Sequence, residues 1–133
     1  MIYAIADTHT LIWYLFEDSR LSRAAKQFME RSAKDGGRIG FSAISVVEIV
    51  YLIEKAKIKP EALPRLLTAI SIENSALVEV PVTGRIAQEM GSIRRESIPD
   101  MPDRIIAATA LNLNIPVISR DRKIKISKLE TIW

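Results

Sequence analysis

Four acidic residues stand where a parallel α/β sheet would bring the ends of its strands together: Asp7, Glu48, Asp103 and Asp121. Each closes an apolar run or opens a segment with helical spacing. Two carboxylates about 4 Å apart repel each other by roughly 4 kcal/mol at an effective dielectric near 20. A group of four therefore persists only if its members are protonated, spread apart or bound to cations.

The composition limits which cation such a group would bind. The chain has one histidine and no cysteine, so the available ligands are almost all oxygens. Hard cations prefer oxygen ligands, whereas zinc and copper favour nitrogen and sulfur. If the four carboxylates converge, the sequence predicts a site for Mg²⁺ or Mn²⁺.

Length and composition indicate one ordinary globular domain over residues 1–133. Apolar residues make up 48% of the chain and charged residues 26%, which is typical of soluble domains. The N-terminus has no basic segment before Asp7, and no apolar run is long enough to span a bilayer. We therefore expect a cytoplasmic protein without a membrane association.

The net charge of +3 is less informative than the positions of the basic residues. Basic residues are frequent in the half of the chain that holds Asp103 and Asp121, and they include Arg104, Arg120 and Arg122. A negative centre surrounded by cations suits a polyanion that is held by its phosphates while metal ions act on one of them. A solvated surface of lysine and arginine explains the same charges.

Short apolar segments alternate with segments of helical spacing along the chain. We predict strands at Ile2–Ala6, Arg38–Phe41, Ala76–Val82, Ile115–Ser119 and Thr131–Trp133. The predicted helices cover Thr10–Phe16, Ser22 to about Lys34, Ser45 to about Lys57, Pro60–Ile70, Thr83 to about Arg95, and Asp103–Leu113. This alternation favours a parallel sheet covered on both faces, in which ligands bind at the carboxyl edge.

Each acid also has a purely structural explanation. Asp7 could cap the first helix, and Glu48 could be the capping-box partner of Ser45. Asp100 could be an N-cap that places Asp103 in a first helical turn, and Asp121 could be a turn residue. Caps need not share one edge of one sheet, however, so the joint pattern favours a site.

Other chemistries lack their sequence patterns. The chain has neither a G-x-x-x-x-G-K-[ST] nor a G-x-G-x-x-G segment, and no G-x-S-x-G element accompanies the single His9. Nucleotide binding by a glycine-rich loop and serine hydrolysis are therefore not predicted.

Four segments together resemble the PIN-domain ribonucleases, and within them the VapC-type toxins of toxin–antitoxin pairs. They are AIADTHTLIWYL, SAISVVEI, DMPDRIIAATAL and IPVISRDRKI, and they follow one another in family order over almost the whole chain. The resemblance implies a three-layer α/β/α PIN-like fold with a central, mostly parallel sheet of four or five strands.

The resemblance also implies roles for individual residues. Asp7, Glu48, Asp103 and Asp121 match the acidic metal-binding set, and Thr8, Asp100 and Ser119 match auxiliary positions beside it. Arg104, Arg120 and Arg122 are candidates for phosphate contacts. The implied protein is a homodimer that pairs with an antitoxin, which inserts a side chain or helix at the acidic site.

The leading hypothesis is an endoribonuclease in which one or two Mg²⁺ or Mn²⁺ ions activate water against an RNA phosphodiester. Its products would carry 5′-phosphate and 3′-hydroxyl ends. One alternative is a non-catalytic PIN-like RNA-binding module, in which the acids act only as caps. A second is a metal-dependent phosphatase.

Overall fold

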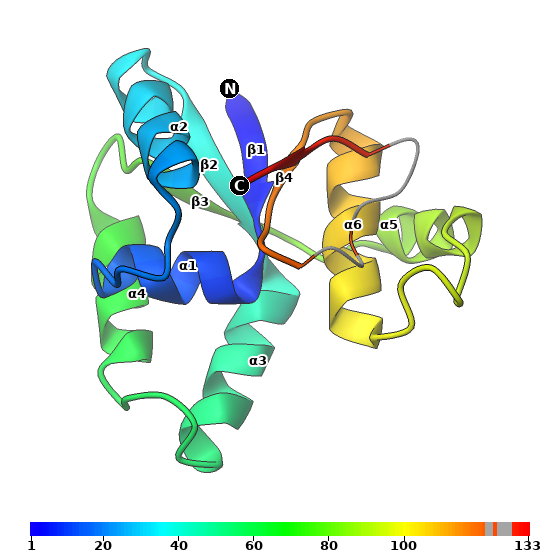
Figure 1. Ribbon diagram of the computed structural model, residues 1–133, viewed down its shortest axis with the longest axis horizontal. Coiled ribbons are helices and arrows are strands. Elements are labelled where there is room, and N and C mark those ends of the chain that lie inside the picture. The colour runs from blue at the N-terminus through cyan, green and yellow to red at the C-terminus, as the bar shows by residue number, and fades with distance from the viewer. Residues whose placement is uncertain (122–123, 125–128) are drawn as a thin grey trace.

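Five parallel strands form the centre of the molecule. The computed structural model describes residues 1–121, 124 and 129–133, and within this part the strand order is β3-β2-β1-β4-β5 (Figure 1). The strands are β1 (Ile2–Ala6), β2 (Arg38–Ser42), β3 (Leu77–Val80), β4 (Val117–Ile118) and β5 (Thr131–Ile132). The helices are α1 (Thr8–Leu15), α2 (Arg23–Lys34), α3 (Ala43–Glu54), α4 (Ala62–Ser71), α5 (Gly84–Glu89), the 3₁₀ turn η1 (Met90–Ser92) and α6 (Met101–Leu113).

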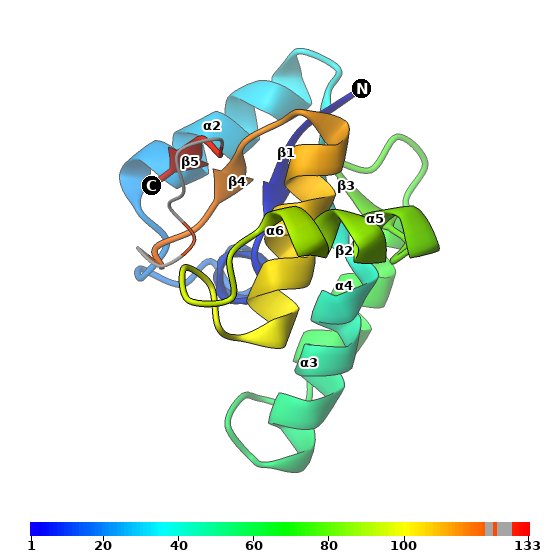
Figure 2. The same ribbon diagram turned by 90° about the vertical axis from the view of Figure 1, so that its right-hand side faces the viewer.

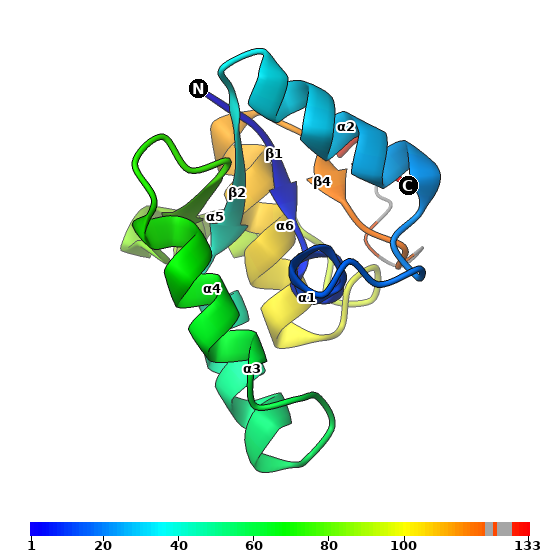
Figure 3. The same cartoon turned by 90° about the vertical axis from the view of Figure 1, so that its left-hand side faces the viewer.

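Helices cover both faces of this sheet. Figure 3 shows α1, α2 and α4 in front of one face, and Figure 2 shows α5 and α6 in front of the other. Ala4 and Ala6 of β1 belong to the core on the first face, whereas Ile5 belongs to the core on the second. Because side chains alternate across a strand, burial on both faces requires the continuous apolar run seen in β1. The predicted three-layer α/β/α fold is confirmed.

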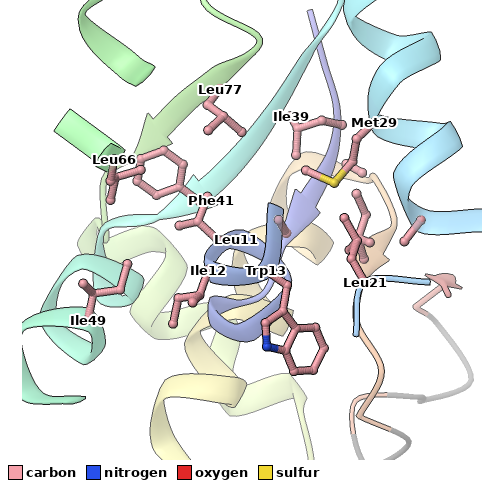
Figure 4. Close-up of a cluster of buried hydrophobic side chains, with 14 of the residues drawn as sticks. Leu11, Ile12, Trp13, Leu21, Met29, Ile39, Phe41, Ile49, Leu66 and Leu77 are labelled. Atoms are coloured by element: carbon pink, nitrogen blue, oxygen red, sulfur yellow. The ribbon is translucent and has the colours of Figure 1, made fainter. Parts of the chain in front are cut away.

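The larger core joins helices α1, α2, α3 and α4 to the first face. Figure 4 shows Phe41 of β2 and Leu11 of α1 packed between Leu66 of α4 and Met29 of α2. All four side chains are fully or almost fully buried. This packing fixes α1 against the sheet, and with it the residues at the start of α1.

The strand order contains one reversal. From β1 the chain builds outward through β2 and β3, and it then returns to the other side of β1 as β4 and β5. In open parallel sheets, the crevice at the carboxyl ends of the two strands where the order reverses is the usual ligand position. Here those strands are β1 and β4, which lie directly before Asp7 and Ser119.

The start of α3 differs from the prediction. The Ser42 hydroxyl, not that of Ser45, caps the helix by accepting a hydrogen bond from the Ile44 N–H at 3.2 Å. The predicted capping box was therefore wrong. Strand β2 runs into α3 without a loop, so its last residue has the extended backbone that an N-cap needs.

Two further boundaries differ near α6. Thr83 caps α5 as predicted, but α5 ends at Glu89 and is followed by η1 rather than continuing to Arg95. The carbonyls of Met90 and Ile93 accept hydrogen bonds from the Arg104 side chain, which holds this turn in place. Helix α6 begins at Met101 because Asp100 is its N-cap.

The described ranges contain no helix with both the length and the apolar character needed to cross a bilayer.

We expect Phe41→Ala to destabilise the protein by about 3–5 kcal/mol, because it removes a fully buried aromatic ring and leaves a cavity. Urea denaturation measures the change. Ile72→Ala, at an exposed position just after α4, is the control and should change stability by less than about 0.5 kcal/mol. Equal midpoints for the two variants would contradict this assignment of the core.

Candidate functional site at the carboxyl edge of the sheet

The four predicted acids come from four different elements. Asp7 follows β1 and is the N-cap of α1, and Asp121 stands three residues beyond the end of β4. Glu48 lies in the second turn of α3, the helix that follows β2 directly. Asp103 lies in the first turn of α6, where its N–H donates to the Asp100 carboxylate at 3.1 Å.

A serine joins the acids that follow β1 and β4. The Ser119 hydroxyl donates to Oδ2 of Asp7 at 2.5 Å and accepts a hydrogen bond from the Asp121 N–H at 2.9 Å. The other oxygen of Asp7 accepts from the Thr10 N–H at 2.9 Å. Asp7 and Ser119 are both buried. These contacts fix the Asp7 carboxylate, and they leave each of its oxygens with a free lone pair to accept another ligand.

A second hydroxyl relay holds Glu48. The Thr8 hydroxyl donates to Oε1 of Glu48 at 2.5 Å and lies 2.9 Å from the Ser45 hydroxyl. A hydroxyl has one proton, so Ser45 must donate to Thr8 when Thr8 donates to an ionised Glu48. Ser45 therefore supports Glu48 from within the same helix, although it does not cap that helix.

Charge repulsion couples the acids across the site. Burial and the negative charges of Asp100, Asp121, Glu48 and Asp7 together raise the pKa of Asp103 to about 7, and burial is the largest cause. Burial also raises the pKa of Glu48, while the Thr8 hydrogen bond opposes this rise. The carboxylates are thus close enough to resist simultaneous ionisation, as expected of a site that a cation would neutralise.

The oxygen atoms present fit a hard cation. Among the described residues, however, no three Asp, Glu, His or Cys side chains form a group that could hold one metal ion directly. Mg²⁺ commonly keeps several waters and contacts only one or two carboxylates. Carboxylates that interact electrostatically, but that do not all contact one ion directly, are compatible with that mode of binding.

A cavity of about 340 Å³ opens beside Asp7 and Asp121, and its other walls are His9, Trp13 and Arg120. His9 and Arg120 are exposed, whereas Trp13 is largely buried. The sequence is compatible with His9 as a ligand, a base or a helix residue with a polar tip, and with Trp13 in a partner groove or in the core. His9 and Trp13 are four positions apart, which places their side chains on the same face of a helix. This spacing is the sequence signal that could have predicted that they line one surface.

The three predicted phosphate-binding arginines have different surroundings. Arg120 lines the cavity, with its guanidinium 5.5 Å from the centre of the Trp13 ring. The Nη2 atom of Arg104 donates to two backbone carbonyls, and its Nε has no hydrogen-bond partner among the described residues. These contacts lend no support to a phosphate contact by Arg104. Arg122 lies outside the described residues.

A family model supports the resemblance noted in the sequence. The model of the PIN domain matches residues 4–129. The chain belongs to the PIN-domain family. The match spans all four acids, in the same order as in the segments that carry the resemblance.

Individual relatives of this PIN domain come from bacteria. It is 27% identical over 125 residues to Ribonuclease VapC22 of Mycobacterium tuberculosis, which covers 94% of this chain and 92% of the relative. It is also similar to a solved toxin–antitoxin complex from Klebsiella pneumoniae, with 26% identity, a TM-score of 0.64, and coverage of 96% and 98% of the two chains. A structure of VapBC2 from Rickettsia felis bound to a promoter DNA fragment gives a TM-score of 0.71 at 23% identity, covering 98% and 97%.

We expect the metal-free PIN domain to lose stability as pH rises from about 4 to about 7. The pKa of Asp103 is about 7 in the folded protein and 3.8 ordinarily, so in this window the folded state keeps a proton that the unfolded state has lost. Asp103→Asn should weaken this decline and stabilise the protein above neutral pH by on the order of 1 kcal/mol, because partial exposure screens the repulsion.

Urea denaturation in EDTA, at mildly acidic and at alkaline pH, measures this effect. Asp35→Asn is a matched control, because Asp35 is an exposed residue at the end of α2. If the two variants show the same pH dependence as the parent protein, the acids do not repel one another as described.

Proposed function

We propose that this PIN domain is a metal-dependent endoribonuclease and the toxin of a toxin–antitoxin pair. The observation that carries the proposal is the electrostatic coupling of four carboxylates, from four separate elements, at the carboxyl edge of the sheet. The relative from Mycobacterium tuberculosis is named a ribonuclease, and the similar solved structures are toxin–antitoxin complexes. A cytoplasmic location, where RNA is abundant, is part of the proposal.

Asp7, Glu48, Asp103 and Asp121 would hold Mg²⁺ or Mn²⁺, in part through water. A bound divalent ion would supply an acidified water and would stabilise negative charge on the phosphate under attack. The chain's own contribution is orientation: Ser119 fixes Asp7, and Thr8 fixes Glu48. Asp100 holds the first turn of α6 and thereby the position of Asp103.

The negative charges of the acids would repel an RNA substrate. A polyanion approaches a negative site only when cations offset the repulsion, and Arg120 is an exposed cation on the cavity wall. We propose that Arg120 contributes to RNA binding. The geometry favours cleavage over mere binding, because caps alone would not require the Ser119 and Thr8 hydroxyls to point at carboxylates.

Besides the side chain or helix that it would insert at the acidic site, the antitoxin would contact a further surface, and a second copy of the chain would contact another. Apolar and basic side chains line a groove of about 750 Å³ beside α1 and the α3–α4 connection, including Ile12, Phe16, Ile58, Lys59 and Arg65. This mixture suits an apolar and acidic antitoxin segment. The exposed apolar residues Val47, Val50 and Tyr51 on α3 are a surface of the kind that a homodimer buries.

We expect Asp7→Asn to reduce RNA cleavage by roughly a hundredfold or more, since it removes a charge that would bind the ion. Asparagine caps helices as well as aspartate does, so folding should be preserved. The assay incubates the purified protein with total RNA and Mg²⁺ or Mn²⁺, with and without EDTA, and maps the ends. The products should carry 5′-phosphate and 3′-hydroxyl groups.

Asp35→Asn is again the control and should cleave like the parent protein. RNA binding without cleavage by the parent protein under all metal conditions would support the non-catalytic module instead. Hydrolysis of small phosphomonoesters, with RNA left intact, would support the phosphatase.

We expect Ser119→Ala to lower cleavage by roughly ten- to a hundredfold, because residues that orient metal ligands commonly have effects of this size. The loss should be accompanied by a higher Mg²⁺ concentration for half-maximal activity, since Asp7 loses its donor. Ser92→Ala is a control, because the exposed Ser92 hydroxyl donates to the carbonyl of Glu89 at the end of α5. An unchanged Mg²⁺ requirement in Ser119→Ala would show that Ser119 does not orient Asp7 for metal binding.

A further inference from the structure

Aromatic and cationic side chains gather around Trp13 on one side of the acidic site. The centre of the Trp13 ring lies 5.7 Å from that of His9 and 5.7 Å from that of Trp133. The guanidinium carbons of Arg20 and Arg120 lie 5.3 Å and 5.5 Å from the Trp13 ring centre. Both distances are within the range in which a cation is attracted to an indole. Figure 4 shows the Trp13 indole at the lower margin of the core cluster.

The two arginines differ in what else they contact. Arg20 is neutralised by Asp18, whose carboxylate lies 2.7 Å from Nη2. Arg120 forms no ion pair with another described residue, and its exposed side chain borders the cavity. The charge of Arg120 is therefore available to a ligand in the cavity.

The cavity has two chemically distinct sides. Asp7 and Asp121 form the acidic side, while His9, Trp13 and Arg120 form what we call the stacking wall. Trp13 is only 7% exposed, so it serves mainly as a support on which the exposed His9 and Arg120 rest. A ligand in this cavity would meet carboxylate oxygens on one side, and aromatic rings with a planar guanidinium on the other.

We propose that the stacking wall is a nucleobase subsite, which takes one unpaired base of the RNA next to the phosphate at the acids. This inference rests on the proposed function and adds to it a position for one base at His9, Trp13 and Arg120. Unpaired bases stack on histidine rings and on arginine planes, whereas paired bases are not free to do so. Arg120 would act here through its planar face as well as its charge.

The two tryptophans allow binding to be tested without cleavage. Trp13 and Trp133 are the two tryptophans of the chain; Trp13 lines this cavity, and the Trp133 ring lies next to the Trp13 ring. We expect adenosine and uridine 5′-monophosphates to quench the intrinsic fluorescence of the parent protein in a saturable manner. Ribose 5-phosphate, which has the phosphate but no base, should bind at least roughly five- to tenfold more weakly. Equal affinities would overturn the proposal.

Substitution of Arg120 separates stacking from charge. Arg120→Ala should weaken nucleotide binding and binding of a short single-stranded RNA by roughly five- to a hundredfold, a range set by the stacking of one base. Arg120→Lys keeps the charge but lacks the planar group, so it should recover only part of this loss. Arg31→Ala, on the exposed last turn of α2, is the matched control and should bind like the parent protein.

Cleavage mapping completes the test. His9→Ala and Arg120→Ala should change the base preference at the cleavage positions, whereas Arg31→Ala should not. Full recovery of binding and base preference by Arg120→Lys would show that Arg120 acts on phosphate alone, and this would overturn the base subsite. Failure of the parent protein to cut any RNA would instead refute the proposed function, since nucleotide quenching and the Arg120 comparison do not depend on turnover.

Discussion

Repulsion among carboxylates is the constraint on which the rest of this PIN domain depends. Asp7, Glu48 and Asp103 come from separate elements, and burial together with the neighbouring negative charges raises the pKa of Asp103 to about 7. The fold tolerates this unfavourable arrangement because hydroxyls and backbone N–H groups hold individual carboxylates at fixed positions. The free energy needed to gather them comes from the two apolar cores on either side of the sheet.

The parallel topology explains why residues so distant in sequence meet. Strands β1 and β4 are neighbours although more than a hundred positions separate them, and their carboxyl ends deliver Asp7 and Ser119 to the same crevice. A hydrogen bond from the Thr10 hydroxyl to the carbonyl of Ile118 ties the first turn of α1 to β4. The site at the carboxyl edge of the sheet therefore depends on two features. Capping contacts orient its side chains locally, and the pairing of β1 with β4 brings distant parts of the chain together.

The sequence allowed the sheet, its edge and the acids to be predicted, because apolar runs followed by acids are local patterns. It did not identify Ser42 as the cap of α3, because Ser45 and Glu48 also have the spacing of a capping box, and the sequence does not distinguish the two positions. The choice depends on where β2 ends. Likewise, Arg104 resembled a phosphate ligand by charge, but only tertiary structure brings the carbonyls of Met90 and Ile93 to it. Contacts between elements are not encoded in local patterns.

The acidic site and the stacking wall are mechanically one unit, because helix α1 carries parts of both. Asp7 caps this helix and Trp13 lies six positions later, a rise of about 9 Å along the axis. Asp121 and Arg120 are likewise adjacent in the segment after β4. A change that moves α1 or this segment must shift the acids and the wall together. Substitutions of the exposed His9 and Arg120 side chains leave the acids unchanged, so the proposed base subsite can be altered without replacing a carboxylate.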